Sequence, residues 1–242
     1  MKNKNRVAVI TGASQGIGKA VAQELLREGY NVVFSSRRED ELKKAVEEVK
    51  AFQKQALVVP TDVSDKKSVA NLFQRTIEKF ERVDFLFNNA GWSPSGNFIE
   101  DIPYSDWKKT IDINLTGAFF CTQEAIRIMK KQNPQGGRIL NNGSVAAHAP
   151  RSKFGAYATS KHALTGLTKA TALEGRDFNI ACGQIDLGNV GTELLERLAT
   201  NEAKMPMDSV AKMIVQMASL PLQANVLFTT MLATQMPFVG RG

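Results

Sequence analysis

Short apolar segments alternate with amphipathic segments from one end of the chain to the other. The apolar segments are Val7–Ile10, Asn31–Ser35, Ala56–Pro60, Val83–Phe87, Arg138–Asn141, Asn179–Ile185 and Asn225–Thr230. Strands that are apolar throughout are buried on both faces, and helices between them connect parallel strands. The pattern therefore predicts an α/β fold, a doubly wound parallel sheet of about seven strands with helices on both faces.

The intervals between these strands carry apolar residues at helical spacing. After a first helix containing Ile17, Val21 and Leu25, helices are predicted over Glu39–Ala51, Asp65–Phe80, about Tyr104 to Lys131, Ala156–Gly175 and Met207–Ser219. No segment resembles a linker, because the stretches rich in proline and glycine are short enough to be surface loops. We therefore expect one domain over residues 1–242, with a substrate lid around 193–207 inserted in it.

The composition and the lengths of the apolar stretches indicate the compartment in which such a chain is expected. Hydrophobic residues make up 43% and charged residues 23%, which is typical of a soluble globular protein. No apolar stretch approaches the roughly 18–20 residues of a membrane-spanning helix, and Met1–Arg6 does not lead into a secretion signal. Cys121 and Cys182 lie in apolar segments without metal-ligand spacing, so we expect buried thiols and no metal site. A cytoplasmic protein without a membrane partner is expected.

The charge balance is better explained by an anionic small molecule than by nucleic acid. The chain has 31 Lys and Arg against 24 Asp and Glu, a formal charge of +7. Residues 1–54 hold 11 of the basic and 7 of the acidic residues, so most of the excess lies in the part that precedes the third predicted strand. No basic run is longer than two residues and no stacking aromatic residues cluster, so no nucleic-acid partner is expected.

A glycine-rich turn follows the first predicted strand. Gly12 permits a tight turn, Gly16 lets the backbone approach a pyrophosphate, and Gly18 lets the next helix lie close to the sheet. The spacing is G-x3-G-x-G rather than the commoner G-x-G-x-x-G. The helix N-terminus would offer N–H groups to phosphates, as in a Rossmann-like fold. The candidate cofactor-binding residues here are Gly12, Ser14, Gln15, Gly16, Ile17 and Gly18; the alternative is an ordinary turn rich in glycine.

The end of the second strand favours NADP(H) over NAD(H). A carboxylate at this place would accept the ribose 2′-hydroxyl of NAD, whereas arginine accommodates the 2′-phosphate of NADP. The sequence has Arg37 and Arg38 here, with no carboxylate before Glu39. Guanidinium groups pair with phosphate, so both arginines are candidate ligands. The alternative is that Arg38 only pairs with nearby glutamates on the surface, and position 15 is Gln rather than a second cation.

Tyr157 and Lys161 are four residues apart on a predicted helix and therefore project from the same face. A nearby ammonium favours the phenolate and would lower the pKa of the Tyr157 phenol. Ser144 follows the fifth strand and could hydrogen-bond a substrate carbonyl. Taken alone, the Tyr-x3-Lys spacing is weak evidence for a catalytic site, because any solvated helix can contain it.

These motifs together resemble the short-chain dehydrogenase/reductase family, single-domain subtype. The resemblance covers about residues 6–220 and rests on Thr11–Gly18, Asn88-Asn89-Ala90-Gly91, Asn114, Ser144 and Tyr157-x3-Lys161 in this order. It implies a hydride transfer between NADP(H) and a small carbonyl or alcohol substrate, in a homodimer or homotetramer. An alternative function is a non-catalytic NADP(H)-binding sensor or scaffold, which the intact set of four motif residues disfavours.

The resemblance also implies residue roles. Tyr157 would be the proton donor or base and Ser144 would polarise the carbonyl. Lys161 would bind the nicotinamide ribose and lower the pKa of Tyr157, while Asn114 would hold a water that connects Lys161 to solvent. The cofactor groove would further include Asp62 and Val63 at the adenine, Asn89, Ala90 and Gly91 at the adenosine ribose, and Val190 and Thr192 at the nicotinamide carboxamide.

Two departures from the family pattern concern the loop on the nicotinamide side and the substrate. Leu187 stands where the family usually has proline, and residues 225–242 lack the Asp-Gly-Gly ending frequent among 3-oxoacyl-carrier-protein reductases. The residues expected near the substrate are Trp92, His148, Arg151, Lys153, Phe154, Leu194, Leu195, Met205 and Met207. They favour an apolar carbonyl compound, with an anionic end at Arg151 as one version; solvated cations over a packed lid are the other. His148 is expected to line the pocket rather than to act in catalysis.

Overall fold

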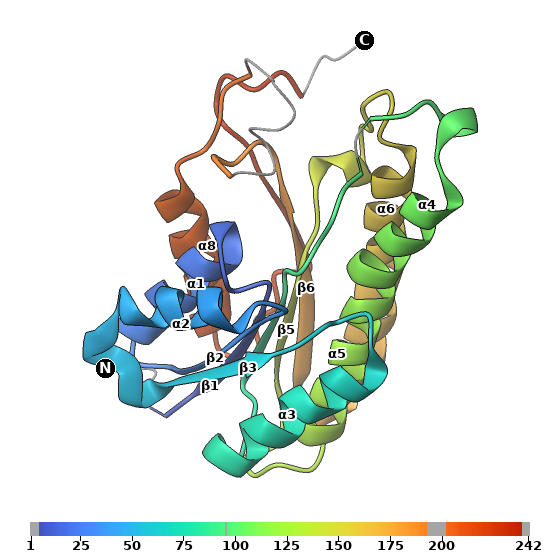
Figure 1. The fold of residues 1–242 in the computed structure, drawn as a ribbon. Coiled ribbons are helices and arrows are strands. Elements are labelled where there is room, and N and C mark those ends of the chain that lie inside the picture. The colour runs from blue at the N-terminus through green and yellow to red at the C-terminus, as the bar shows by residue number, and fades with distance from the viewer. Residues whose placement is uncertain (1–4, 95, 193–201, 239–242) are drawn as a thin grey trace.

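The computed structural model describes residues 5–94, 96–192 and 202–238, and a seven-stranded sheet forms its centre (Figure 1). The strands are β1 (Val7–Thr11), β2 (Asn31–Ser36), β3 (Ala56–Pro60), β4 (Phe85–Asn88), β5 (Gly137–Asn142), β6 (Ile180–Leu187) and β7 (Phe228–Met231). They lie in the order β3-β2-β1-β4-β5-β6-β7, and every neighbouring pair is parallel. The predicted doubly wound sheet is confirmed. The strand order reverses between β1 and β4, and ligands bind beyond the carboxyl ends of strands at such a point.

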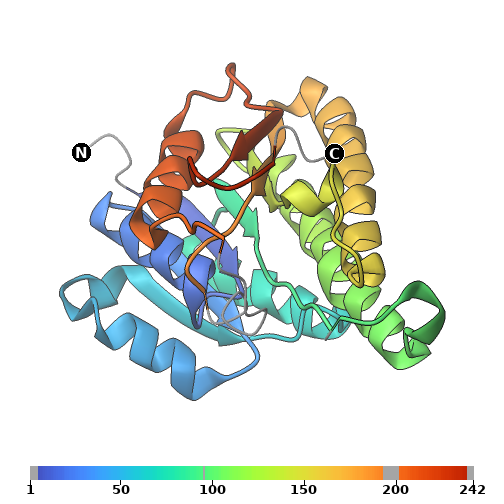
Figure 2. The ribbon, with the colours of Figure 1, turned by 90° about the horizontal axis from the view of Figure 1, so that it is seen from above.

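Helices cover both faces of the sheet (Figure 2). One face is covered by α1 (Gly16–Arg27), α2 (Glu39–Glu47) and α8 (Met207–Ser219), and the other by α3 (Lys66–Phe80), α5 (Gly117–Met129) and α6 (Gly155–Glu174). Successive residues of a strand point to opposite faces, so Val33 of β2 packs in one apolar layer and Phe34 in the other. None of the helices in the described ranges is long and apolar enough to span a membrane.

The helix predicted from about Tyr104 to Lys131 is present and ends at Met129, but it is not α-helical throughout. The segment consists of α4 (Tyr104–Ile111), a π-helical turn η3 (Asp112–Thr116) and α5. A π turn inserts extra backbone into a helix and is frequent at functional sites. Here it carries Asn114, whose side chain turns inward and is buried. The apolar spacing of the sequence runs through this turn without a break, so the sequence contained no signal for it.

Other boundaries differ less. The second helix ends at Glu47 instead of Ala51 and is followed by a 3-10 turn η1 (Lys50–Gln55); further short turns are η2 (Ile99–Asp101), η4 (Val145–Ala147) and η5 (Arg176–Phe178). The last strand begins at Phe228 rather than Asn225. The Asn225 side chain donates to the Cys182 carbonyl (2.7 Å) and accepts from Arg138 (3.2 Å). Both cysteines are free and buried, and burial raises the pKa of each thiol to about 12.

The segment after β7 returns to the carboxyl end of β6. Met236 is buried, and its sulfur accepts from the backbone N–H of Asn189 (3.4 Å). Leu187, the residue in place of the usual proline, closes β6 in register with Met231 of β7. This part of the C-terminal segment therefore supports the loop that follows β6 at the functional edge of the sheet.

Candidate active site

The glycine turn is held against the end of β4 by Asn89. The Asn89 side-chain nitrogen donates to the Thr11 carbonyl (2.9 Å) and the Gly12 carbonyl (3.3 Å). Gly12 and Gly16 have φ of +66° and +56°, in the left-handed region that favours glycine. A Cβ at Gly18 would lie 2.3 Å from the Gly12 carbonyl oxygen, so only glycine lets α1 begin this close to the turn. The expected roles of the three glycines as turn and close-contact residues thus have a geometric basis.

A groove of about 280 Å³ runs along this turn and past the ends of the neighbouring strands. It contains all of the candidate cofactor residues except Gly18 and Val190. Its lining also includes Ser36, Thr61, Trp92, Ile113 and Asn142, which the sequence reasoning did not select. Ser36, Thr61 and Asn142 end or follow a parallel strand, so the alternation of elements could have pointed to them. Trp92 was assigned to the substrate instead; it lines this groove, and Lys109 lies 4.2 Å from its ring centroid.

The end of the groove at β2 is basic. Both Arg37 and Arg38 line it. Arg38 forms an ion pair with Glu41 (2.6 Å) and donates to the Gln15 side chain (3.3 Å), so the surface pairing considered for it does occur. Arg37 is exposed. Beside them the Ser36 hydroxyl is buried without a hydrogen-bond partner in the described structure, which is costly unless a ligand supplies one.

Tyr157 and Lys161 lie on α6 beside the end of β5, as their spacing predicted. The Lys161 ammonium donates to the Asn142 carbonyl (2.6 Å) and lies 5.6 Å from the Tyr157 ring centroid. Burial raises the pKa of the Tyr157 phenol, a hydrogen bond with Ser144 lowers it, and the charge of Asp186 raises it further. The sequence predicted that the Tyr157 pKa is lowered. In the protein alone this pKa is instead raised, because burial has the largest effect on it.

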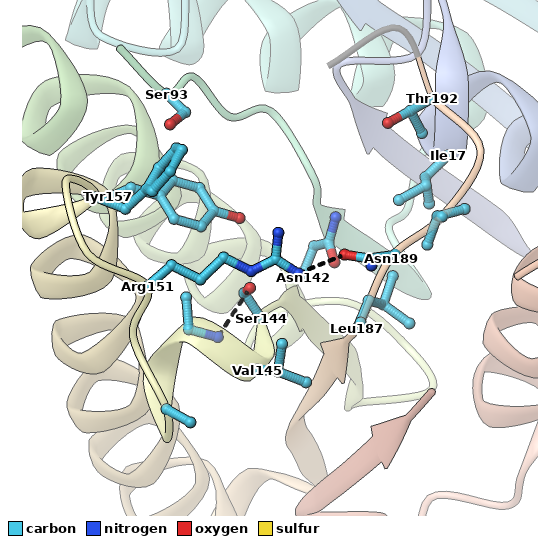
Figure 3. A pocket seen from close by; sticks show the side chains of 16 residues that line it. Ile17, Ser93, Asn142, Ser144, Val145, Arg151, Tyr157, Leu187, Asn189 and Thr192 are labelled. Carbon is cyan, nitrogen blue, oxygen red and sulfur yellow. Dashed lines mark hydrogen bonds between the residues drawn. The ribbon is translucent and has the colours of Figure 1, made fainter. Parts of the chain in front are cut away.

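Ser144 lies at the start of η4, directly after β5. Its hydroxyl oxygen accepts from the Ala146 backbone N–H (3.1 Å), which leaves the hydroxyl proton available to another acceptor. Figure 3 shows Ser144 and the Tyr157 hydroxyl directed toward the same space, and in this view the Arg151 side chain crosses that space toward Asn189. The serine and the tyrosine, 13 residues apart in sequence, therefore reach one site.

Asn114 connects the loop after β4 to α6. Its oxygen accepts from the Trp92 backbone N–H (2.7 Å), and its nitrogen donates to the Trp92 carbonyl (2.9 Å) and the Ser160 hydroxyl (3.0 Å). Ser160 in turn donates to the Tyr157 carbonyl (2.7 Å). Asn114, which is predicted to hold a water, thus links the loop after β4 to α6. Its side-chain oxygen can accept one more hydrogen bond.

A second cavity of about 180 Å³ adjoins the groove on the far side of Tyr157. Its apolar lining residues are Ile17, Val145, Ala146, Ala149, Phe154, Leu187 and Val190. Phe154 and Arg151 were expected there. Arg151 is not a solvated cation, because it forms an ion pair with Glu202 and donates to the Asn189 side chain (3.2 Å).

Other residues assigned to the substrate lie elsewhere. Met205 is buried and Met207 packs against the same apolar layer, while Lys153 lies 4.6 Å from the Phe98 ring centroid. His148 does not line the cavity; its Nε2 pairs with Asp186 (2.7 Å). Leu194 and Leu195, with residues 193–201 of the expected lid, lie outside the described residues. The cavity of about 180 Å³ is therefore formed mainly by the segments after β5 and β6.

Lys161 should make stability depend on pH. Burial lowers the pKa of its ammonium from 10.5 to about 8, so the unfolded chain binds the proton more tightly than the folded protein. The resulting destabilisation is fully present below pH 8 and disappears as the pH rises to 10.5. We expect Lys161→Met to be more stable than wild type by about 1–3 kcal/mol at pH 7, with a smaller difference at pH 9.5, in urea unfolding. A difference that does not change with pH would contradict this assignment.

The sheet is open and parallel, and a glycine turn lies at the point where its strand order reverses. A serine, a tyrosine and a lysine lie beside that turn. Together these features define a dinucleotide-dependent type of oxidoreductase. A family model described as short chain dehydrogenase matches residues 6–203. The chain belongs to the short-chain dehydrogenase family.

Known proteins agree with this membership. A 3beta-hydroxysteroid dehydrogenase of Mediterraneibacter gnavus is 36% identical over 192 residues, 79% of this chain and 68% of that protein. An alcohol dehydrogenase of Thermococcus sibiricus in complex with 5-hydroxy-NADP has a TM-score of 0.84 at 26% identity, covering 93% of this chain and 95% of its own. A 3-ketoacyl-(acyl-carrier-protein) reductase of Brucella melitensis in complex with NADH has a TM-score of 0.88 at 24% identity, covering 96% and 98%; it shows the fold alone.

Proposed function

We propose that this chain is an NADP(H)-dependent oxidoreductase that transfers hydride between nicotinamide and a carbonyl or secondary alcohol. The proposal rests chiefly on one observation: the groove at the glycine turn and the apolar cavity meet at Tyr157, which lines both. Ile17, Asn142 and Thr192 also line both, so a ligand in the groove would reach the cavity beside the tyrosine hydroxyl. A homodimer or homotetramer is part of the proposal, on the family resemblance.

The residues of the groove suit a dinucleotide phosphate. The N-terminus of α1 has no side-chain cap, so its N–H groups are available to a pyrophosphate. The partnerless Ser36 hydroxyl and the exposed Arg37 provide hydrogen bonds and charge for a phosphate at the other end. When bound, the nicotinamide would supply or accept the hydride.

The protein side chains would donate and accept the proton that accompanies hydride transfer. In reduction, Tyr157 gives its phenolic proton to the carbonyl oxygen while Ser144 donates a hydrogen bond to the same oxygen. In oxidation, Tyr157 takes the proton from the alcohol. Burial keeps the pKa of Tyr157 above its ordinary value, so the phenol is protonated at neutral pH and suited to reduction. Lys161 binds the nicotinamide ribose, and Asn114 holds a water for proton resupply.

The cavity suggests the substrate class. Most of its lining is apolar, and its only cation, within the described part of the chain, is Arg151. Because Arg151 is paired with Glu202, an anionic substrate would first have to displace a carboxylate. An uncharged, mainly apolar ketone or aldehyde is therefore favoured over one with an anionic end.

The test of the function is NADPH consumption against a panel of ketones, aldehydes, quinones and 3-oxoacyl thioesters. Turnover with at least one uncharged carbonyl compound is expected. Tight NADPH binding without any turnover across the panel would instead support the non-catalytic sensor.

Cofactor choice can be tested at the basic end of the groove. Arg37→Ala should weaken NADPH binding about 10- to 100-fold and NADH binding by about threefold or less, because only NADPH carries the 2′-phosphate. Arg38→Ala should have a smaller effect, since Arg38 already pairs with Glu41. Lys43→Ala is the matched control: Lys43 lies on α2, pairs with Glu39 and does not line the groove. Equal losses for the two cofactors in Arg37→Ala would argue against NADP(H) preference.

A further inference from the structure

A carboxylate is buried directly beneath Ser144. Asp186 lies on β6 and is 0% exposed. Its Oδ1 accepts from the Ser144 backbone N–H (3.0 Å) and from the Gln184 side chain (2.8 Å). Its Oδ2 lies 2.7 Å from Nε2 of His148, in the loop after η4. The side-chain hydrogen bonds of this carboxylate are thus made with the segment that carries Ser144 and with its own strand.

The surrounding chain is shaped to fit this carboxylate. A Cβ at Gly143, the residue before Ser144, would lie 1.9 Å from Asp186 Oδ1, so the carboxylate fills the space where any other side chain at position 143 would stand. Gln184, which donates to the same oxygen, is itself fixed from α6: its nitrogen donates to Thr165 (3.0 Å) and its oxygen accepts from Thr168 (3.0 Å). Asp186 is therefore part of a network that ties β6 and α6 to the Ser144 loop.

Burying a carboxylate is costly unless it is paired, and the partners here are unequal. His148 is half-exposed, with 45% of its side chain accessible, so it covers the carboxylate from the solvent side. From α6, the titratable groups within electrostatic reach are Tyr157 and Lys161; the charge of Asp186 raises the pKa of both. The neighbouring position on β7 is the uncharged Thr230. The reaction proposed above makes no direct use of Asp186 or His148.

We propose that Asp186 and His148 form a positioning pair, in which the carboxylate holds the Ser144 backbone so that the Ser144 hydroxyl faces Tyr157. The inference rests on the proposed oxidoreductase function and extends it to two residues that do not touch substrate. His148 shields the carboxylate from solvent and hydrogen-bonds it, and the carboxylate also places one negative charge near the Tyr157–Lys161 pair. Neither residue belongs to the motifs by which the sequence resembles its family.

The first test is the kinetics of Asp186→Asn, which keeps the shape of the side chain and removes its charge. In the full chain with NADPH, kcat should fall about 10- to 100-fold, because a neutral amide oxygen holds the Ser144 N–H less firmly than a carboxylate does. The Kd for NADPH should stay within about threefold. The pH of half-maximal alcohol oxidation should fall, because the charge that helps to raise the pKa of Tyr157 is gone. A residue needed only for folding would lower the active fraction and leave the pH profile where it was.

The second test uses His148 and the other histidine of the chain. His148→Ala should lower kcat about tenfold, whereas His148→Gln, whose amide can still donate to Asp186, should restore most of the rate. His162→Gln is the control: His162 is exposed on α6 and contacts the Ala158 carbonyl, so kcat should not change. These variants leave the buried carboxylate in place and decide the question even where Asp186→Asn does not fold.

A third measurement does not depend on activity. The Ser144 amide should exchange with deuterium about tenfold faster in His148→Ala and Asp186→Asn than in wild type, and at the wild-type rate in His162→Gln. If wild type reduces a carbonyl but the Asp186 and His148 variants keep its kcat and pH profile, the positioning pair is wrong and the oxidoreductase function stands. If wild type has no turnover, the function fails; unchanged Ser144 exchange would then overturn the pair too, and faster exchange would support it.

Discussion

Replacing Tyr157 by phenylalanine is expected to lower kcat about a thousandfold while NADPH binds with nearly wild-type affinity. The substitution removes only the hydroxyl, and the ring keeps its place on α6 between the groove and the apolar cavity. The lost hydroxyl is the proposed proton donor, and no other phenol lines either cavity in the described part of the chain. The measurements are single-turnover oxidation of NADPH with a carbonyl compound that wild type reduces, and the Kd for NADPH by fluorescence.

The control for this experiment is Tyr104→Phe. Tyr104 begins α4 and is 75% exposed, so its hydroxyl contributes to neither cavity and kcat should not change. Unchanged turnover in Tyr157→Phe would remove Tyr157 from the mechanism. A parallel loss of NADPH affinity and turnover would indicate instead that the hydroxyl supports the groove rather than the chemistry.

Gly18→Ala is expected to have the largest effect on the fold and the groove together. The added Cβ would lie 2.3 Å from the Gly12 carbonyl oxygen and 2.4 Å from the Asn89 side-chain nitrogen. The first of these atoms is backbone, so either α1 or the glycine turn must move. We expect a loss of about 3 kcal/mol in the free energy of unfolding and at least about a tenfold weaker Kd for NADPH, measured by urea unfolding and fluorescence titration.

Gly166→Ala provides the matched control on α6. A Cβ at Gly166 would meet nothing within 4 Å, and alanine is the better helix former. This variant should be more stable than wild type by about 0.5–1 kcal/mol, with unchanged NADPH affinity. A Gly18→Ala protein with wild-type stability and affinity would show that the turn can adjust, and that glycine at position 18 is not required for close contact.

The sheet and the groove could be predicted from the sequence because their signals lie within single strands, helices and turns. Apolar runs and helical spacing identify the strands and helices, and the carboxyl ends of parallel strands lie along one edge. Gly12 was expected at this edge from its place in the turn, and the family resemblance implied that Asp62, Asn89 and Thr192 line the same groove; all four line it. The π turn at Asn114 escaped prediction because it changes the backbone without interrupting the apolar spacing.

The residues expected near the substrate were predicted less well, because their positions depend on contacts between loops. His148 and Arg151 both looked like cavity residues, but only Arg151 lines the cavity. Their partners, Asp186 and Glu202, lie 38 and 51 residues away in sequence. Spacing along a strand or helix contains no information about such pairs, whereas Tyr157 and Lys161 could be placed together because one helix carries both.

The sequence by itself determined the architecture and the position of the groove, since these follow from periodicity and from motifs within single elements; together with the family resemblance it named most of the residues around the groove. Only the tertiary structure decided their electrostatic environment. Burial raises the pKa of Tyr157 and lowers that of Lys161, Glu202 pairs with Arg151, and a buried carboxylate lies beneath Ser144. These properties depend on exclusion of water and on distances between segments remote in sequence, and both arise only when the sheet and its loops have packed.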